Sequence, residues 1–178
     1  MKLFSKQALI TLGFVIMAPM TANAATVHLD AKTNTNTNAV ELSLKAGTYT
    51  VNPFKDDTYT AWNAWNGTVT GCDGAGANCS KGWINSYSIV TPTETIFTSN
   101  LGRYANAELA LADALGATFT LASDAIVKFF IKDSNSKDNI GGMSLNVSAV
   151  PIPAAAFLFA PALLGFMGLR RRAQKSVA

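Results

Sequence analysis

Two segments of the sequence hold side chains whose types and spacing suit ligand binding, and the first is rich in tryptophan. Trp62, Asn63 and Trp65 lie within the segment Tyr-Thr-Ala-Trp-Asn-Ala-Trp-Asn. Aromatic rings next to amide side chains suit sugar recognition, because an aromatic face stacks on the C–H side of the sugar ring while the amides bond the sugar hydroxyls. We therefore take these three residues as candidates for sugar binding. The alternative is that the tryptophan rings fill the core, with Trp83 as a third.

The second segment, residues 133–142, reads Asp-Ser-Asn-Ser-Lys-Asp-Asn-Ile-Gly-Gly. Calcium prefers hard oxygen ligands on a loop that glycines allow to wrap tightly. Asp133, Asp138 and Asn139 are the candidate side-chain ligands, and Ca²⁺ is the one cofactor that the sequence suggests. The alternative is a solvated turn in which these side chains support local hydrogen bonds.

The sequence offers no set of residues for nucleophilic catalysis. His28 is the sole histidine, and no nucleophile, base and orienting group can be assembled around it from sequence alone. Asp56, Asp57, Asp73 and Asp124 are available for a pair of carboxylates, as glycoside hydrolysis requires. Because all four lie in turn-rich contexts, where solvated aspartates are usual, we predict that the protein is not an enzyme.

The two cysteines lie in a glycine-rich segment. Cys72 and Cys79 are separated by six residues, of which two are glycine and two alanine. In an oxidising compartment we expect them to form a disulfide that orders this loop, and the alternative is two free thiols. A metal site would need further soft ligands.

The elements that must position these side chains are mostly strands. Apolar and polar residues alternate with period two at 40–44, 49–51 and 143–147, which predicts half-buried strands. Residues 125–131 form a continuous apolar run broken only by Lys128, which predicts a more central strand.

One helix and several turns complete the prediction. Residues 104–115 are rich in alanine and leucine and are followed by Gly116, which favours a helix. Turn chemistry occurs at 33–38, Asn52-Pro53, Asp56-Asp57 and Gly141-Gly142. Many short strands with one short helix predict a mainly β fold, a β-sandwich of the jelly-roll or galactose-binding type.

Residues 1–24 have the pattern of a secretory signal peptide. Lys2 and Lys6 precede an apolar stretch at 8–20, and Ala22 and Ala24 place small residues where signal peptidase needs them. We expect cleavage after Ala24, and the alternative is an uncleaved N-terminal anchor.

Residues 150–178 combine a proline motif, an uncharged segment and an arginine cluster. The uncharged segment, residues 154–169, would be about 24 Å long as a helix, against about 30 Å for a hydrocarbon core. It is therefore a marginal membrane span. Arg170, Arg171 and Arg172 follow it and would stay on the cytoplasmic side, so the preceding domain would lie outside.

Charge separates the terminal segments from the domain between them. The chain has a formal net charge of +3, but residues 25–149 hold eight basic and eleven acidic residues, a net charge of −3. A surface that binds nucleic acid needs clustered lysine and arginine, which this domain lacks, so we expect no nucleic-acid partner. Its 125 residues form one domain of common size.

The C-terminal segment resembles the PEP-CTERM sorting signal of Gram-negative bacteria. Val150, Pro151 and Pro153 match its Val-Pro-x-Pro motif, with Ile152 at the position that is usually glutamate, and the arginine cluster ends it. The resemblance implies an exosortase-type membrane protease as partner, which would cut near the motif after the precursor has passed through the inner membrane. It also implies a final location at the cell surface or in an extracellular polysaccharide matrix. An ordinary tail anchor is the alternative.

A second resemblance covers the domain more loosely. The segment from Phe129 to Asp133 and the run Asp-Asn-Ile-Gly-Gly-Met-Ser-Leu-Asn-Val from Asp138 resemble the galactose-binding lectins of the PA-IL type. The resemblance implies a jelly roll that binds sugar through calcium, held by Asp133, Asp138 and Asn139. Two hypotheses follow: an exported carbohydrate-binding module without catalysis, or a structural matrix protein that self-associates without a ligand.

Overall fold

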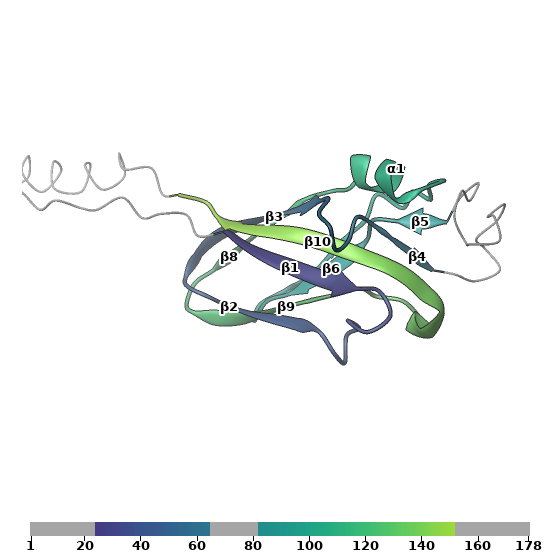
Figure 1. Cartoon of the computed structure of the whole chain (residues 1–178). Coiled ribbons are helices and arrows are strands. Elements are labelled where there is room, and N and C mark those ends of the chain that lie inside the picture. The colour runs from purple at the N-terminus through teal and green to yellow at the C-terminus, as the bar shows by residue number, and fades with distance from the viewer. Residues whose placement is uncertain (1–23, 65–81, 152–178) are drawn as a thin grey trace, which may run out of the picture. The chain divides into compact units, whose positions relative to one another are not determined.

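The computed structural model describes residues 24–64 and 82–151 (Figure 1). Within these ranges the protein is mainly β with one short α-helix, as the sequence predicts, and it also has one short 3-10 helix. The elements are β1 (Ala24–Asp30), β2 (Val40–Leu44), β3 (Gly47–Phe54), β4 (Trp62–Ala64), β5 (Trp83–Ile84), β6 (Tyr87–Val90), β7 (Thr95–Thr98), α1 (Ala107–Ala112), β8 (Ala117–Leu121), β9 (Ala125–Phe130), η1 (Ser136–Asp138) and β10 (Asn139–Ala149). The predicted strand at 40–44 has the observed bounds.

The larger sheet has six strands and is organised around β10, which has eleven residues. Its order is β5-β4-β10-β3-β8, and β1 pairs with the other edge of β10. Along one edge of β10, residues 139–141 pair with β4 and residues 144–149 with β3. All these pairs are antiparallel, and in Figure 1 the long green β10 ribbon lies beside β1 along most of its length.

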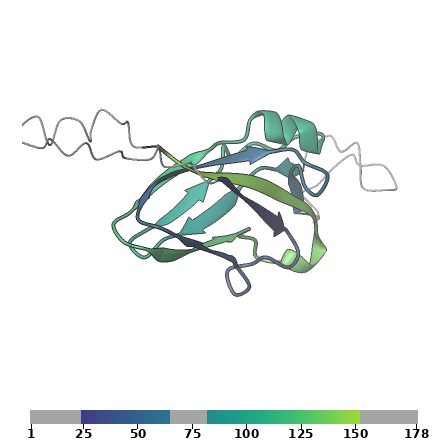
Figure 2. The same cartoon turned by 60° about the vertical axis from the view of Figure 1, so that its left-hand side comes forward.

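The smaller sheet has four antiparallel strands in the order β2-β9-β6-β7. Strand β9 lies between β2 and β6, which confirms the prediction of a central strand for the apolar run. In the turned view of Figure 2 the β10 ribbon passes in front of the teal strands of this sheet.

One hydrophobic core joins the two sheets. Alternate residues of the strands point inward, so Val27, Val51 and Leu145 from the larger sheet share a cluster with Ile89 and Phe129 from the smaller one. Each of these five side chains is almost fully buried. Removing such side chains from water supplies about 1.5–3 kcal/mol each, which makes this cluster the main source of stability.

Two glycines expected in a turn lie inside strand β10 instead. Gly141 has φ of +78°, and a Cβ atom on it would lie 2.6 Å from the Ala61 carbonyl oxygen. A Cβ on Gly142 would collide with the Leu29 carbonyl oxygen and would lie 2.7 Å from the Tyr59 ring. The turn prediction is therefore wrong at this position, because the glycines serve the close approach of neighbouring backbone rather than a chain reversal. Asn52 and Pro53, also expected in a turn, continue β3.

Helix α1 is shorter than the 104–115 segment that the sequence predicts. Its N-cap is Asn106, whose side chain accepts a hydrogen bond from the Leu109 N–H at 2.9 Å. Tyr104 does not join the helix because its N–H and C=O both bond Trp83 at 3.0 Å, as in a strand pair.

No helix in the described residues is long and apolar enough to span a membrane. Several predicted features lie outside the described residues, namely the expected signal peptide up to Asn23, Pro153 of the sorting motif, the uncharged segment 154–169, the arginine cluster and the cysteine pair. Ala24, Val150 and Pro151 lie within the described residues.

Candidate functional site

The structure places Trp62 and Asn63 inside the fold. Trp62 is 2% exposed, and its indole N–H donates to the Ser86 carbonyl oxygen at 2.9 Å. Asn63 is 1% exposed. The core alternative thus describes Trp62, and the ring does not present a face to solvent. Trp65 lies outside the described residues.

The three candidate calcium ligands have different surroundings. Asp133 is half-buried after β9, whereas Asn139 is buried at the start of β10 and donates to the Ala31 carbonyl oxygen at 3.0 Å. Asp138 accepts a hydrogen bond from Asn135 at 2.9 Å. Within the described part of the chain, no group of three histidine, cysteine, aspartate or glutamate residues could hold a metal ion. Calcium binding stays a prediction.

Asp133 lines an open hollow together with an aromatic ring that the sequence analysis did not single out. Phe97 on β7 is 54% exposed, and with Lys132, Asp133 and Ser134 it lines an open hollow of about 410 Å³. We call this feature the Phe97 hollow. In the described structure none of the three polar side chains has a hydrogen bond or ion pair to protein, so their polar groups are available to a ligand.

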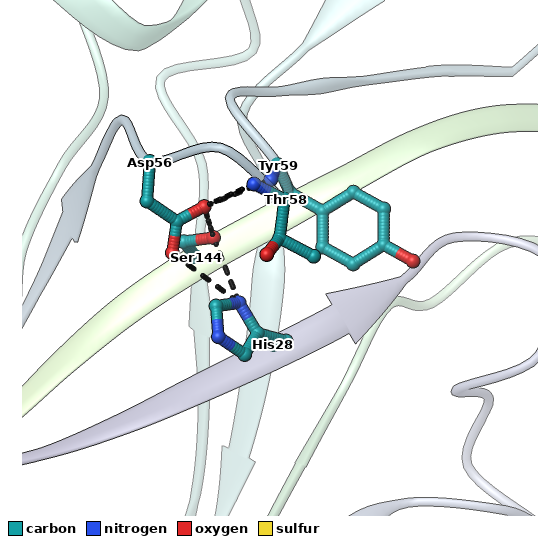
Figure 3. Close-up of polar contacts among 5 residues, drawn as sticks. All are labelled: His28, Asp56, Thr58, Tyr59 and Ser144. Carbon is teal, nitrogen blue, oxygen red and sulfur yellow. Dashed lines mark hydrogen bonds and ion pairs between the residues drawn. The ribbon is translucent and has the colours of Figure 1, made fainter.

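A second cluster joins residues that are far apart in the sequence, His28, Asp56 and Ser144 (Figure 3). His28 and Ser144 face each other across the β1–β10 pair, and Asp56 reaches them from the segment between β3 and β4. His28 Nδ1 lies 3.1 Å from Ser144 Oγ and 3.5 Å from Asp56 Oδ2, while the Ser144 hydroxyl donates to Asp56 Oδ1 at 2.8 Å.

These three residue types also form nucleophilic catalytic sites, but their geometry here differs. In such a site the serine and the aspartate bond opposite nitrogens of the imidazole. Here both face Nδ1, and the ring's other nitrogen points away from the cluster (Figure 3). Ser144 is also only 1% exposed, so its hydroxyl cannot reach a substrate without a rearrangement of β10. The cluster is built to hold the segment after β3 against β1 and β10.

The carboxylate of Asp56 is the acceptor that organises this cluster. Its Oδ1 accepts the N–H groups of Thr58 at 2.8 Å and Tyr59 at 2.9 Å, as well as the Ser144 hydroxyl. Desolvation raises the pKa of Asp56, but the hydrogen bonds from Tyr59, Ser144 and Thr58 and the nearby His28 outweigh it, so the pKa lies below its usual value.

Asp30 repeats this arrangement at the end of β1. Its Oδ1 accepts the N–H groups of Lys32 at 2.8 Å and Thr33 at 2.9 Å, and its Oδ2 accepts the Tyr59 hydroxyl at 2.9 Å. Desolvation raises the pKa of Asp30, and the bonds from Tyr59, Thr33 and Lys32 lower it to below its usual value overall. Tyr59 thereby connects the two carboxylates, with its N–H on Asp56 and its hydroxyl on Asp30.

Sequence reasoning missed both the Phe97 hollow and the His28 cluster. A signal for the cluster was present, because His28 and Ser144 both occupy polar positions of alternating strands. Their pairing depends on the register of strands 116 residues apart, which no local pattern fixes.

Comparisons with known proteins found no match. No protein-family model matches the chain, and no match was found among curated proteins or among solved structures.

Proposed function

We propose that the protein is an exported carbohydrate-binding module without catalytic activity, with its two sheets forming a sandwich of the jelly-roll type. The observation that carries the proposal is the Phe97 hollow, where an exposed aromatic ring adjoins three polar side chains free of protein partners. We propose this combination as a candidate sugar site in place of Trp62 and Asn63, which are buried, and sugar binding by Trp65 stays a prediction.

The chemistry of the Phe97 hollow suits a sugar ring. The exposed phenyl face can stack on the C–H side of the ring, while the Asp133 carboxylate accepts hydrogen bonds from hydroxyls. Lys132 donates, and the Ser134 hydroxyl can do both. A hollow of about 410 Å³ lies within the range of small-molecule sites, which begins at about 300 Å³.

Two observations support a binding role rather than catalysis. The hydroxyl of the His28–Asp56–Ser144 cluster is buried, and that cluster does not take part in the Phe97 hollow. Among the described residues that line the hollow, Asp133 alone carries a carboxylate, whereas acid–base hydrolysis of a glycoside uses two.

The proposed export and sorting of the protein are based on the two terminal segments of the sequence. Residues 1–24 would direct export, and residues 150–178 would serve as a PEP-CTERM-type signal that an exosortase-type protease processes at the inner membrane. The described strands run from Ala24, the last residue of the expected signal peptide, to Ala149, just before the C-terminal segment. The mature domain would act at the cell surface or in the extracellular polysaccharide of a Gram-negative bacterium.

The test is titration calorimetry of the protein with soluble oligosaccharides, with and without added calcium. Phe97→Ala and Asp133→Asn should each weaken the binding at least tenfold, since each removes one side of the hollow. Ile126→Ala and Asp57→Asn are matched controls, because Ile126 is an equally exposed apolar residue of β9 and Asp57 is an exposed aspartate elsewhere. Absence of heat with every sugar, or equal losses in the controls, would refute the proposal.

A further inference from the structure

The outer face of the six-stranded sheet is a continuous surface of uncharged hydroxyl and amide side chains. Strand register aligns Thr26, Asn146 and Asn52 in one row across β1, β10 and β3. The next row, across β10, β3 and β8, is Ser148, Thr50 and Thr118. A third row pairs Thr48 with Thr120. We call these three rows the hydroxyl–amide face.

The residues of the hydroxyl–amide face are accessible. Thr26, Asn52, Thr118, Thr120 and Asn146 are exposed, and the remaining three are half-exposed. The opposite sides of the same strands carry core residues such as Val51, Phe119 and Val147. Adjacent strands lie about 4.8 Å apart, and residues on one side of a strand repeat about every 6.8 Å, so the rows form a regular array.

Charge is almost absent from this part of the molecule. Asp30, at the end of β1, is the only lysine, arginine, aspartate or glutamate in strands β1, β3, β8 and β10. The smaller sheet is different, because Glu41 on β2 and Lys128 on β9 form an exposed ion pair at 3.0 Å. The absence of every long charged side chain from an exposed sheet face is notable, since lysine, arginine and glutamate are mostly found exposed on protein surfaces.

Much of the hydrogen-bonding capacity of the hydroxyl–amide face is unused. Thr48 and Thr120 bond each other at 3.0 Å, and the Ser148 hydroxyl donates to Asn146 at 2.7 Å. In the described structure the side chains of Thr26, Asn52 and Thr118 have no hydrogen bond to protein, and neither has the amide N–H₂ of Asn146. The face therefore offers donors and acceptors together, with threonine methyl groups between them.

We propose that the hydroxyl–amide face binds a chain of neutral polysaccharide. A covered lysine or carboxylate would have to be desolvated, whereas hydroxyls and amides exchange their bonds to water for bonds to sugar hydroxyls. An acidic polysaccharide or a nucleic acid would require cations that the face lacks. A protein partner fits less well, because interface cores are enriched in aromatic residues and no member of the three rows is aromatic.

Binding at this face would depend on repetition. Each hydroxyl pair contributes little, but a polymer engages several rows at once, so its affinity exceeds that of a short fragment. The proposal takes its ligand class from the proposed function but concerns a different surface, since Phe97, Lys132, Asp133 and Ser134 belong to none of the three rows. The hollow would hold one or two sugar rings, and the face would hold a chain.

The test is affinity electrophoresis of the full chain in a detergent without sugar groups, in gels containing galactomannan, a neutral β-glucan or acidic alginate. Wild-type protein should be retarded by a neutral polymer and not by alginate, and the retardation should persist at high salt. Thr118→Lys and Asn146→Lys should each lower the retardation at least fivefold, because they place a cation among the rows. Ser43→Lys is the matched control, since Ser43 is an exposed residue of β2 in the other sheet.

A second variant removes hydroxyls without adding charge or disturbing strand propensity. Thr26→Val with Thr118→Val should lower the retardation by neutral polymer while leaving the thermal unfolding temperature unchanged. Phe97→Ala should lose oligosaccharide binding and keep polymer binding, which separates failure of the hollow from failure of the face. Retardation by alginate alone, no retardation at all, or an equal effect of Ser43→Lys would overturn the proposal.

Discussion

The outer faces of the two sheets cover one shared core, yet they present different chemistry to solvent. The six-stranded sheet carries the hydroxyl–amide face, with rows of threonine, serine and asparagine and a single charged residue at one end. The four-stranded sheet carries an ion pair and exposed apolar side chains, Ile126 and Phe97. Since inward positions supply the stability, the outward positions of each sheet are free to differ, and we infer that they differ in ligand.

The largest effect on the free energy of unfolding should come from a residue of the core that the two sheets share. Leu145→Ala removes a fully buried side chain of β10 and should lower the free energy of unfolding by about 2–5 kcal/mol. Its neighbour Asn146 points outward, so Asn146→Ala should change that free energy by less than about 0.5 kcal/mol. Urea unfolding followed by tryptophan fluorescence measures both. Similar losses for the two variants would mean that the hydroxyl–amide face is itself part of the stabilising structure.

A smaller loss of stability is expected from the His28–Asp56–Ser144 cluster, which holds the segment after β3 against the six-stranded sheet. Asp56→Asn weakens the acceptor for two backbone N–H groups and one hydroxyl, and should lower the free energy of unfolding by about 1–3 kcal/mol. Asp57→Asn is the control, because Asp57 is exposed and its side chain has no hydrogen bond in the described structure. An equal loss in both variants would contradict the role given to Asp56.

The same carboxylate makes the prediction dependent on pH. The pKa of Asp56 is lower in the folded protein than the ordinary value of 3.8, so its contribution is present above about pH 4 and is lost as pH falls through the folded value. Asp30 has a lowered pKa as well and should contribute in the same direction. In Asp56→Asn the free energy of unfolding should therefore fall less steeply below pH 4 than in the wild type. If the free energy of unfolding falls equally steeply below pH 4 in the variant and the wild type, then Asp30 and other carboxylates, rather than Asp56, cause the loss of stability in acid.

The smallest effect is expected from the charge on the four-stranded sheet. Lys128→Met breaks the ion pair with Glu41, in which both side chains are about half-exposed, at 51% and 50%. Exposed pairs contribute about 0–1 kcal/mol, so unfolding should change by no more than this, and the difference should shrink with added salt. A larger change would mean that the outward side chains of the four-stranded sheet contribute to the stability of the protein.

Much of the fold could be predicted because its signals are local. The alternation at 40–44 gives β2 directly, and the apolar run at 125–131 identifies β9 as an interior strand of its sheet. Predictions failed where a distant contact decided the conformation. Gly141 and Gly142 look like a turn by composition, but the approach of Ala61 and Leu29 keeps them in β10. Tyr104 adjoins the alanine- and leucine-rich segment and is predicted to be helical, but it forms a strand-like pair with Trp83 and lies outside the helix.

The candidate sites were less predictable than the fold. Trp62 and Asn63 have the composition of a sugar site, yet the pairing of β4 with β5 and β10 encloses both side chains. Asp133 was identified from the sequence for its oxygen chemistry, and the structure shows that it lines the same hollow as Phe97. No pattern along the chain connects positions 97 and 133, because they are brought together by the strand order of the smaller sheet and the segment after β9.

The sequence by itself determined the alternating strands, the acidic balance of residues 25–149 and the basic, apolar character of the two ends. These are properties of composition and short-range periodicity, which do not depend on contacts between residues far apart in the chain. Only the tertiary structure decided which polar side chains align in rows, that Ser144 is buried beside His28 and that Trp62 belongs to the core. Strand register and burial depend on contacts between residues far apart in the chain, and a shift of one residue would exchange the two faces of every strand.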